Sequence, residues 1–591
     1  DSIKRVEILS TLREKAPSLP ELDAATLGKL RTLGQILEAL PSSGPAPAAA
    51  VVAAAVVAAP AAATAPENGA TLQKMLLDVV ADKTGYPAEM LKLEMSLEAD
   101  LGIDSIKRVE ILSTLREKAP SLPELDAATL GKLRTLGQIL EALPGQSGSG
   151  ATVNFNSAGE EEAGPLARMV LRIVAAPATS AVLPGPLALL RDSEGLAARL
   201  LPALRARGVE AAVVDKIADL PADRGVVFLP GVEAHSQGLQ AFRAARKGRL
   251  GAGGAFITVT RMGNFGLHGC THPDAAALGG LVKTIALEHP GTRARAIDLD
   301  PSLDADNAAL LLADEILREG PLELALGKGY RHTLVTEPEP TRADSPLPGR
   351  KDVIVVSGGA RGVTATCLLE LARRGQPKLA ILGRSPIDLP ESAPVAAAAD
   401  EAGIKRALFQ TVQGLSPAEL GKRAAAILAA REARANLDAL RAAGSEVLYL
   451  AVDVADAAAV RGALATVRGR LGAVTGLVHA AGVIQDKRLL EKTEAQWESV
   501  YRTKVDGARA LLDGTAGDTL KWIVFFSSVA GRTGNIGQCD YAMANEVLNR
   551  TAAWLSTQRP GCVCRAIGWG PWEGGMVTPA LKKQFEAMGV A

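Results

Sequence analysis

Apolar positions recur at helical spacing in the first quarter of the chain and then fall into short β-branched runs. The helix predicted at the start of residues 70–144 has one apolar stripe, formed by Leu72, Met75, Leu76 and Val79. A second helix is predicted after Asp104, with an apolar face formed by Ile106, Val109, Leu112 and Leu115, and a third in the segment GKLRTLGQILEAL. This pattern predicts a small all-α bundle of three or four helices.

From about residue 165 the pattern predicts strands that alternate with Ala/Leu-rich helices, which is typical of α/β layers. There are two runs of this kind. Residues 165–345 contain AAVVD, GVVFLP and GAFITVT but no Gly-rich phosphate loop, whereas residues 346–591 contain one. The predicted fold class is therefore α/β, with two Rossmann-like subdomains preceded by small all-α four-helix bundles.

An internal repeat shows that the chain contains parts of two helical bundles. Residues 1–41 recur without a change as residues 104–144, so the chain starts inside one copy and we expect sequence upstream of it. We expect the partial copy to be less well packed than the complete bundle at 70–144. Linkers are predicted at 42–69 and 145–164. The first contains an uncharged Ala/Pro run, and Pro60 and the lack of flanking cations favour a semi-rigid linker over a membrane span.

Composition narrows the classes of partner. Hydrophobic residues make up 48% and charged residues 22% of the chain, and the formal net charge is zero, which favours neither nucleic acid nor an anionic membrane. The five cysteines are scattered, and no secretory signal precedes them. We expect a reducing, cytoplasmic setting without a disulfide framework.

A Gly-rich turn after residue 356 predicts a dinucleotide site. An apolar strand at 353–356 leads into Ser357-Gly358-Gly359-Ala360-Arg361-Gly362, and a helix follows from Val363. Glycines let the backbone approach a pyrophosphate, and the start of the helix offers N–H groups and a positive dipole end. The strand–turn–helix context makes this more than an ordinary turn.

The following strand ends indicate which dinucleotide binds. Arg384 and Ser385 stand where an NAD enzyme usually has an acidic residue, which suits a 2′-phosphate and favours NADPH; the alternative is an ordinary surface arginine. Two later strand ends are expected to border the same crevice, and they carry Asp453, Val454, Ala480, Ala481 and Gly482.

Four residues form a candidate catalytic set: Lys504, Ser528, Tyr541 and Asn545. Tyr541 can donate a proton to a carbonyl oxygen during hydride transfer, and Ser528 can hold that oxygen. We expect the cation of Lys504, which lies on an otherwise apolar helix face, to lower the pKa of Tyr541. A snorkelling lysine is the alternative for Lys504. Asn545, one turn after Tyr541, can seat a water that relays protons.

These motifs resemble the ketoreductase domains of polyketide and fatty acid synthases, within the short-chain dehydrogenase/reductase superfamily. The similar segments are VVSGGARGVT, LGRS, VDVAD, LVHAAGV, KVDGARAL, FFSSVAGRTGNIGQCDYAMAN and GWGPW. In that family the lysine precedes the serine and an asparagine follows the tyrosine, as in this chain. The resemblance implies NADPH-dependent reduction of a β-ketoacyl thioester. The first α/β run, with GLVKTIALEHP, resembles the family's structural subdomain, which lacks a cofactor site.

The repeats resemble acyl carrier protein domains, because LGIDSIKRVEIL matches the carrier serine motif. By this resemblance Ser2 and Ser105 bear 4′-phosphopantetheine; the alternative for Ser105 is a plain helix N-cap. The tandem form is most similar to the carrier array of polyunsaturated fatty acid synthases. It implies acyl thioesters on the chain's own carriers as substrates. It also implies ketosynthase, acyltransferase, dehydratase and phosphopantetheinyl transferase partners, and a homodimer.

Some positions depart from these families. Thr364 replaces the third glycine of the fingerprint, which would loosen helix–strand packing, and Lys107 and Arg108 follow the carrier serine where many carriers are acidic. Residues 386–446 form an Ala-rich insertion that is either helical packing or a docking element. By the same resemblance, Ile484-Gln485-Asp486 stands where ketoreductases that make the D-hydroxy product tend to carry Leu-Asp-Asp. Thr533 stands where the opposite class tends to have Trp, so the resemblance favours a (3R)-hydroxy product.

Two other functional classes compete with the reductase: a non-catalytic scaffold with a degenerate reductase, and a dehydrogenase of small alcohols fused to helical repeats. The complete catalytic set argues against the first, and the carrier serines argue against the second. His268, Cys270 and His272 alternate as zinc ligands do, but no fourth ligand stands at a familiar spacing, so no metal is expected.

Overall fold

The computed structural model describes residues 69–98, 100–103, 108, 111–112, 114–115, 118–119, 133–142, 168–177, 179–229, 234–268, 270, 272–340 and 346–570. The predictions for the partial repeat 1–41, for Ser2 and Ser105, and for the linkers (Gly69 apart) fall outside these residues. So does the end of the GWGPW motif.

The described part of the all-α region has an apolar core. It contains α4 (Gly69–Thr84), the 3₁₀ turn η1 (Ala88–Met90) and α7 (Leu136–Ala142). Leu72, Leu76 and Val79 of the predicted stripe are buried in α4, whereas Met75 is half-buried. Arg108 is buried too and donates from Nη1 to the carbonyl oxygen of Leu133 at 2.9 Å, so its charge faces the interior of this region.

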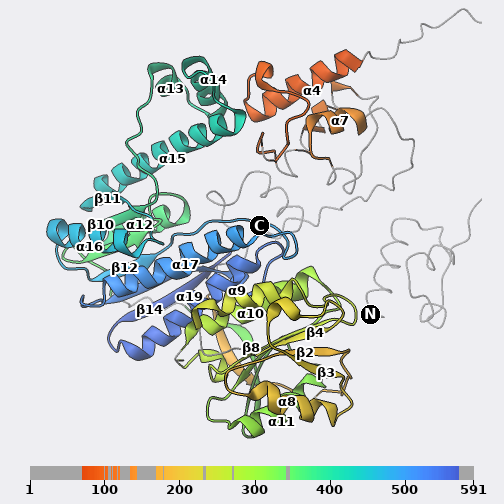
Figure 1. Ribbon diagram of the computed structural model, residues 1–591. Helices are drawn as coiled ribbons and strands as arrows, with labels where there is room; N and C mark the ends of the chain where they lie inside the picture. The colour runs from red at the N-terminus through yellow and green to blue at the C-terminus, as the bar shows by residue number, and fades with distance from the viewer. Residues whose placement is uncertain are drawn as a thin grey trace, which may run out of the picture. The chain divides into compact units, whose positions relative to one another are not determined.

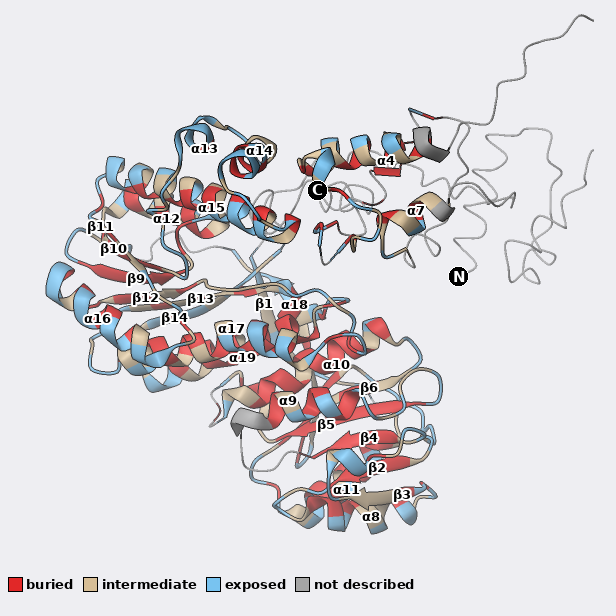
Figure 2. Ribbon diagram, turned by 45° about the horizontal axis from the view of Figure 1, so that its top comes forward, coloured by how far each residue is buried: buried red, intermediate tan, exposed pale blue. Residues whose placement is uncertain are grey.

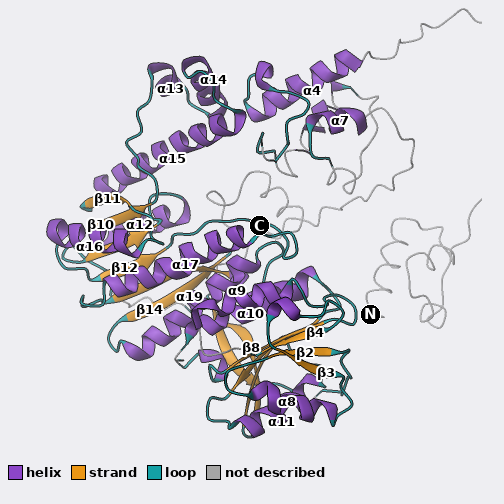
Figure 3. Ribbon diagram, in the orientation of Figure 1, coloured by secondary structure: helices purple, strands orange, loops and turns teal. Residues whose placement is uncertain are grey.

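The first α/β layer is built on an eight-stranded sheet with helices packed against it (Figures 1 and 3). The strand order is β1-β8-β7-β6-β5-β4-β2-β3. Its strands are β1 (Met169–Ala175), β2 (Leu187–Leu190), β3 (Ala211–Val214), β4 (Gly225–Phe228), β5 (Ala255–Thr260), β6 (Arg293–Leu299), β7 (Glu323–Gly327) and β8 (Tyr330–Pro338). Its helices are α8 (Leu196–Arg205), α9 (Ala234–Ala245), α10 (Ala277–Glu288) and α11 (Ala305–Ile316), with short turns η2 (Ile217–Asp219), η3 (Asn264–Gly266) and η4 (Pro273–Ala276). Strands β2 to β7 are parallel to one another, whereas β8 pairs antiparallel with both β7 and β1.

The second layer is a fully parallel six-stranded sheet in the order β11-β10-β9-β12-β13-β14, which is the doubly wound Rossmann order. Its strands are β9 (Val353–Ser357), β10 (Lys378–Gly383), β11 (Val447–Ala451), β12 (Gly476–His479), β13 (Trp522–Ser528) and β14 (Val563–Trp569). Its helices are α12 (Gly362–Gly375), α13 (Ala393–Ala397), α14 (Glu401–Thr411), α15 (Pro417–Ala442), α16 (Ala457–Leu471), α17 (Glu494–Gly514), α18 (Val529–Thr533) and α19 (Cys539–Gln558).

Burial explains why the central strands read as unbroken apolar runs. Every residue of β4, β5, β7 and β9 is buried, because helices cover both faces of each sheet (Figure 2). In the second sheet, Val355 packs towards α16, α17 and α19, and Ile354 packs towards α12 and α15. The prediction of two Rossmann-like sheets is confirmed.

The two sheets share a packed boundary made by α10 and α19. Gly280 of α10 allows the close approach, because a Cβ there would lie 2.7 Å from the carbonyl oxygen of Ala542. Trp497 of α17 stacks on Phe242 of α9, with ring centroids 6.1 Å apart. Helices α17 and α19 of the second subdomain therefore pack against helices α9 and α10 of the first. Among the described residues, no helix is both long enough and apolar enough to cross a membrane.

Candidate active site

The predicted site residues gather at one edge of the six-stranded sheet, where its parallel strands end. The strand order changes direction at β9: β10 and β11 lie on one side, and β12, β13 and β14 on the other. Ligands of such sheets bind in the crevice at this switch point. The Gly-rich turn follows β9, Arg384 follows β10, Ala480 follows β12, and Ser528 ends β13.

The turn after β9 has the shape that a pyrophosphate needs. Gly358 has φ 74°, and a Cβ there would lie 2.8 Å from the Cα of Ala481, so only glycine fits. Gly362 (φ 59°) opens α12, and the N-cap residue Arg361 makes no side-chain cap bond. A narrow glycine turn before a helix start without a side-chain cap suits a phosphate. The residues present therefore fit a bound dinucleotide.

Packing below the turn is tight despite the departure from the fingerprint. Thr364 is buried in α12. The close approach of helix and strand lies at Gly359 instead, where a Cβ would meet Cγ1 of Val356 at 2.6 Å. A small residue is therefore needed at Gly359, and the loosening expected at Thr364 stays a prediction.

Helix α15 reaches the same turn, which the sequence did not predict. Asn436 donates from Nδ2 to the carbonyl oxygen of Ala360 at 2.9 Å, and Glu432 Oε1 accepts from the N–H of Gly362 at 3.3 Å. A carboxylate therefore stands at the N-terminus of α12, where its charge interacts favourably with the helix dipole. A cofactor phosphate at that helix end must compete with Glu432.

Removing this charge should improve cofactor affinity. We expect Glu432→Gln to tighten NADPH binding by about two- to fivefold, because a charge at a helix terminus is worth about 0.3–1 kcal/mol. Titration of NADPH fluorescence would measure the change. Glu370→Gln, at an exposed position in the C-terminal half of α12, is the control and should bind as wild type does. Weaker binding by Glu432→Gln would contradict the expectation.

The other predicted cofactor residues stand at neighbouring strand ends. Arg384 and Ser385 are exposed after β10, and the carbonyl oxygen of Ser385 accepts from Tyr449 Oη at 2.6 Å. Asp453 is exposed after β11 and accepts from the N–H of Ala455, whereas Val454 is buried. The N–H groups of Ala480 and Ala481 both lie 3.3 Å from Ser357 Oγ, which fixes the segment that leads into Gly482.

His479, at the end of β12, was not predicted as a functional residue. Its Nδ1 lies 2.7 Å from Ser357 Oγ and its Nε2 lies 2.8 Å from the carbonyl oxygen of Lys504. Burial, followed by the charge of Lys504, lowers the pKa of His479 to about 3, so the ring is neutral. Because a carbonyl can only accept, Nε2 carries the proton and Nδ1 accepts from Ser357. A histidine inside an apolar strand was the feature of the sequence that could have revealed it. Through these two contacts, His479 links the Gly-rich turn after β9 to α17.

The four candidate catalytic residues converge from three elements. Lys504 of α17 is buried, donates from Nζ to the carbonyl oxygen of Phe526 at 3.0 Å and lies 5.1 Å from the ring centroid of Tyr541. Ser528 Oγ accepts from the N–H of Ala530 at the start of α18. Asn545 donates to the main-chain oxygen of Tyr541 at 2.8 Å, and its Oδ1 is a buried acceptor that no described residue satisfies.

The electrostatics of this set differ from the expectation in one respect. Burial raises the pKa of Tyr541, and hydrogen bonding with Asn545 and Ser528 opposes the shift without reversing it. The expected lowering by Lys504 is wrong for this state, because the ammonium group lies over the ring and is itself partly desolvated. Burial lowers the pKa of Lys504 to about 8. The burial of its amine also rules out the snorkelling alternative.

Buried polar contacts also hold the two loops beside Tyr541. Lys492 and Asp540 form an ion pair with N···O 2.8 Å and almost no exposure. Glu288, from α10 of the first subdomain, accepts from the N–H of Gly537 at 2.8 Å and from that of Leu489 at 2.7 Å. The first subdomain therefore fixes both loops.

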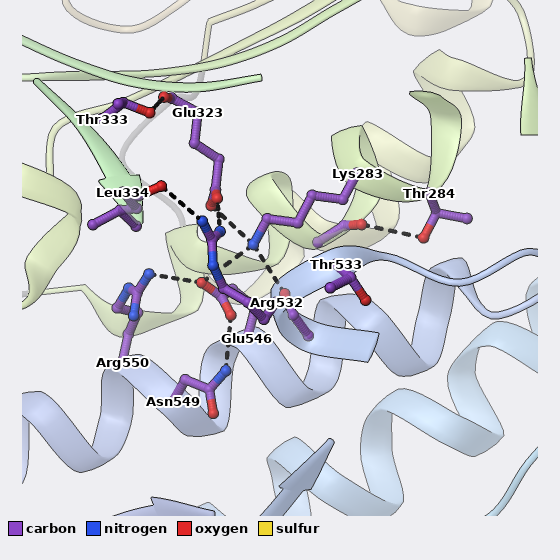
Figure 4. Close-up of polar contacts among 12 residues, drawn as sticks. Lys283, Thr284, Glu323, Thr333, Leu334, Arg532, Thr533, Glu546, Asn549 and Arg550 are labelled. Carbon is purple, nitrogen blue, oxygen red and sulfur yellow. Dashed lines mark hydrogen bonds and ion pairs between the residues drawn. The ribbon is translucent and has the colours of Figure 1, made fainter. Parts of the chain in front are cut away.

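A buried ion cluster joins the same two subdomains behind the site (Figure 4). Lys283 Nζ lies 2.8 Å from Glu323 and 3.5 Å from Glu546, and it donates to the carbonyl oxygen of Gly531. Arg532 pairs with Glu323, and Arg550 pairs with Glu546 at 2.7 Å. Burial alone would raise the pKa of Glu546, but the neighbouring cations lower it. Because Glu546 follows Asn545 in α19, this cluster positions the helix that carries two of the candidate catalytic residues.

The alternating His268, Cys270 and His272 do not assemble a ligand set in the part of the chain that the structure describes. No group of three or more His, Cys, Asp or Glu side chains there could hold a metal ion. Cys270 is buried, and burial raises the pKa of its thiol to about 11.

Two family models match the chain. Residues 353–574 match the KR domain, and residues 74–143 match the phosphopantetheine attachment site. The first match contains the Gly-rich turn and all four candidate catalytic residues. The second contains Ser105.

Curated relatives are large synthases. The chain is 33% identical to a component of the polyunsaturated fatty acid synthase of Thraustochytrium sp., over 684 positions that cover 100% of this chain and 24% of that protein. It is 31% identical to erythronolide synthase EryA3 of Saccharopolyspora erythraea, over 51% of this chain and 8% of that protein. The chain therefore spans about a quarter or less of the length of these relatives.

Solved structures share the fold. A ketoreductase domain from the bacillaene assembly line aligns with a TM-score of 0.51 at 21% identity, covering 71% of this chain and 88% of that chain. A C2-type ketoreductase from a modular polyketide synthase aligns with a TM-score of 0.53 at 19% identity, covering 70% of this chain and 87% of that chain. These likenesses concern the two-sheet architecture.

Proposed function

We propose a function for this chain, which is an acyl carrier and ketoreductase region of the polyunsaturated fatty acid and type I polyketide synthase kind. On this premise, it reduces a β-ketoacyl thioester to the β-hydroxyacyl thioester with NADPH. The substrate is carried on phosphopantetheine. The observation that supports this most directly is the convergence of Lys504, Ser528, Tyr541 and Asn545 beside a glycine turn that fits a dinucleotide.

Tyr541 is the proton donor in this proposal. NADPH, when bound, supplies the hydride that reduces the β-carbon. Negative charge then develops on the ketone oxygen, and the Tyr541 hydroxyl donates its proton there. Its raised pKa keeps the hydroxyl protonated at neutral pH, as a donor must be. Ser528 Oγ already accepts from the N–H of Ala530, so its own proton can be donated to the same ketone oxygen.

Lys504 and Asn545 support the proton donor. Since the pKa of Lys504 is about 8, most of its amine is charged at neutral pH, and this charge stabilises the tyrosinate left after transfer. The buried Oδ1 of Asn545 is an acceptor suited to orient a proton relay that reprotonates Tyr541. His479 fixes the main chain at Lys504 and is a positioning residue.

Around this reaction we propose the arrangement expected from the sequence. Ser105 bears the phosphopantetheine arm of the carrier at 70–144, and Ser2 that of the partial copy. Residues 165–345 are the structural subdomain and 346–591 the catalytic subdomain. A phosphopantetheinyl transferase, further synthase domains (ketosynthase, acyltransferase and dehydratase) and a homodimer complete the proposed assembly. A reducing cytoplasmic setting agrees with five free cysteines.

The product is proposed to be the (3R)-hydroxyacyl thioester. Asp486 of the Ile484-Gln485-Asp486 segment accepts from Gln538 Nε2 at 3.0 Å, which holds this segment beside the start of the Tyr541 helix. It is thus placed where it can favour one face of the ketone. Chiral chromatography of the product would decide between the two hydroxy isomers.

The proposal is tested by mixing the chain with NADPH and a β-ketoacyl-pantetheine surrogate. Oxidation of NADPH, followed by its near-ultraviolet absorbance, with formation of the β-hydroxy product is the expected result. A folded chain that binds NADPH but yields no product would favour the alternative, a non-catalytic scaffold. That alternative is not favoured, because the KR match includes the whole candidate catalytic set.

Arg384 should decide the choice of dinucleotide. We expect Arg384→Ala to weaken NADPH binding by about 10- to 100-fold and to leave NADH binding unchanged, because a charge-assisted hydrogen bond to the 2′-phosphate is lost. Binding titrations with both dinucleotides would measure this. Arg373→Ala, which removes an exposed arginine of α12, is the matched control. Equal losses for NADH and NADPH would contradict a role in reading the 2′-phosphate.

A further inference from the structure

The insertion between β10 and β11 has two parts with different packing. The C-terminal half of α15 lies on the Rossmann sheet, where Ala433, Leu437 and Leu440 join the core formed by β9 and β10. This half is the crossover helix that a parallel sheet requires. Helices α13 and α14 and the N-terminal half of α15 extend beyond the sheet (Figure 1). The helical-packing alternative therefore explains only half of the insertion.

The outer half is buried against the carrier region instead. Leu420, Ala424 and Ile427 of α15 and Ile404 and Leu408 of α14 share one apolar core. Apart from further residues of the insertion, the other members of this core come from the carrier region and include Leu72, Leu76, Val79 and Tyr86. Apolar side chains of two distant stretches of sequence are thus removed from water together, which is what a stable contact surface requires.

Specific contacts fix the position of the turn after α4 on this surface. Lys405 of α14, 3% exposed, donates from Nζ to the carbonyl oxygen of Thr84 at 2.7 Å and lies 4.2 Å from the ring centroid of Tyr86. Small residues allow the approach. A Cβ at Gly85 would lie 2.7 Å from the Cα of Ala402, and a Cβ at Gly421 would lie 2.7 Å from Tyr86 Oη.

A second contact lies beside the catalytic residues. Glu98 of the carrier region pairs with Lys487 at 2.8 Å, and the hydrogen bond from Lys487 lowers the pKa of Glu98. The N–H of Lys487 donates to the carbonyl oxygen of Gly537, in the loop that leads to Tyr541. Glu98 precedes Ser105 by seven residues in the sequence. The carrier region is therefore held at the outer insertion and at the rim of the active site.

We propose that residues 386–428 are a docking platform for the chain's own acyl carrier domain, and that the Glu98–Lys487 pair orients the docked carrier at the reductase. This inference rests on the proposed function and names the surface that delivers its substrate. Tethering alone raises the local substrate concentration, whereas a matched surface also selects the orientation of the carrier.

Delivery from the carrier can be measured separately from the chemistry. The full chain, with Ser2→Ala so that only Ser105 is loaded, receives a β-ketoacyl-phosphopantetheine group from its coenzyme A ester and a phosphopantetheinyl transferase. A single turnover with NADPH then gives the rate for the carried substrate. The free β-ketoacyl-pantetheine surrogate gives the rate without a carrier.

We expect Lys405→Glu to slow reduction of the carried substrate about tenfold or more, because a charge-assisted bond is lost, and to leave reduction of the free surrogate unchanged. Arg406→Glu is the matched control, because it makes the same change of charge at the neighbouring residue, which is exposed on the same helix. Equal rates of carried-substrate reduction in wild type, Lys405→Glu and Arg406→Glu would overturn the proposal.

Reversing the charges of the Glu98–Lys487 pair gives a second test if Lys405→Glu fails to fold. Glu98→Lys alone should slow reduction of the carried substrate, and adding Lys487→Glu should restore it. No rescue in the double variant would overturn the orienting role of this pair.

Amide exchange distinguishes failure of the docking from failure of the proposed function. If wild type reduces neither substrate, the proposed function is wrong, but the docking is still decided by exchange at residues 401–411. Faster exchange there in Lys405→Glu than in Arg406→Glu supports the platform, and equal exchange overturns it.

Discussion

Replacing Tyr541 with phenylalanine is expected to lower kcat for the free β-ketoacyl-pantetheine surrogate by about 100- to 10,000-fold, the range that one positioned general acid contributes. The substitution removes only the hydroxyl, so the ring keeps its contact with the Lys504 cation, whose Nζ lies 5.1 Å from the ring centroid. Ser528 and Asn545 also stay in place. Steady-state NADPH oxidation would measure kcat, and cofactor titration would show that NADPH binding is retained.

A second buried tyrosine provides the control. Tyr501 lies in α17 and stacks on Trp497, with ring centroids 4.5 Å apart. Tyr501→Phe removes a hydroxyl from the same half of the molecule without touching the candidate catalytic set, and we expect its kcat to stay close to that of wild type. Similar rates for Tyr541→Phe and wild type would show that another group donates the proton.

Replacing Glu546 with leucine is expected to destabilise the reductase by about 3–5 kcal/mol, because breaking a buried ion pair leaves uncompensated charge in the interior. Lys283 and Arg532 would keep only the carboxylate of Glu323 among the acidic residues drawn in Figure 4, and Arg550 would lose the carboxylate of Glu546. Urea unfolding followed by tryptophan fluorescence would measure the loss. All five tryptophans lie beyond residue 496, so the signal reports the catalytic subdomain.

The chain contains a closely matched exposed pair. Glu370 and Arg374 have the same i,i+4 spacing as Glu546 and Arg550, but their side chains are 50% and 64% exposed, against 3% for each of the buried pair. Glu370→Leu should cost about 1 kcal/mol or less, as exposed pairs do. Equal costs at the two positions would mean that the buried cluster does not position α19 through its charges.

The strands of the reductase were predictable because burial on both faces leaves a plain sequence signal. Residues 353–356 read as one apolar run, and the whole of β9, including Ser357, is buried. The positions of the candidate catalytic residues were predictable because strand ends and one helical turn determine where they stand. Ser528 ends β13, and Tyr541 and Asn545 lie one turn apart in α19.

Contacts between distant segments could not be predicted in the same way. Lys283 and Glu288 look like ordinary polar positions of a helix, yet both reach across the boundary to main-chain groups of the catalytic half. The pKa of Tyr541 was predicted with the wrong sign because burial, which no local pattern reveals, outweighs its polar neighbours. The two roles of the insertion likewise depend on what covers each half of α15.

Helix α15 has 26 residues, so it is about 39 Å long. One end lies in the core shared with the carrier region. Near the other end, Glu432 and Asn436 contact the Gly-rich turn after β9. A rigid helix that contacts two binding partners gives them a route for thermodynamic linkage. Such linkage is reciprocal: whatever factor the seated carrier applies to NADPH affinity, NADPH must apply to the seating of the carrier. The insertion would then couple the affinity for the reductant to the seating of the carrier, as well as provide the place where the carrier docks.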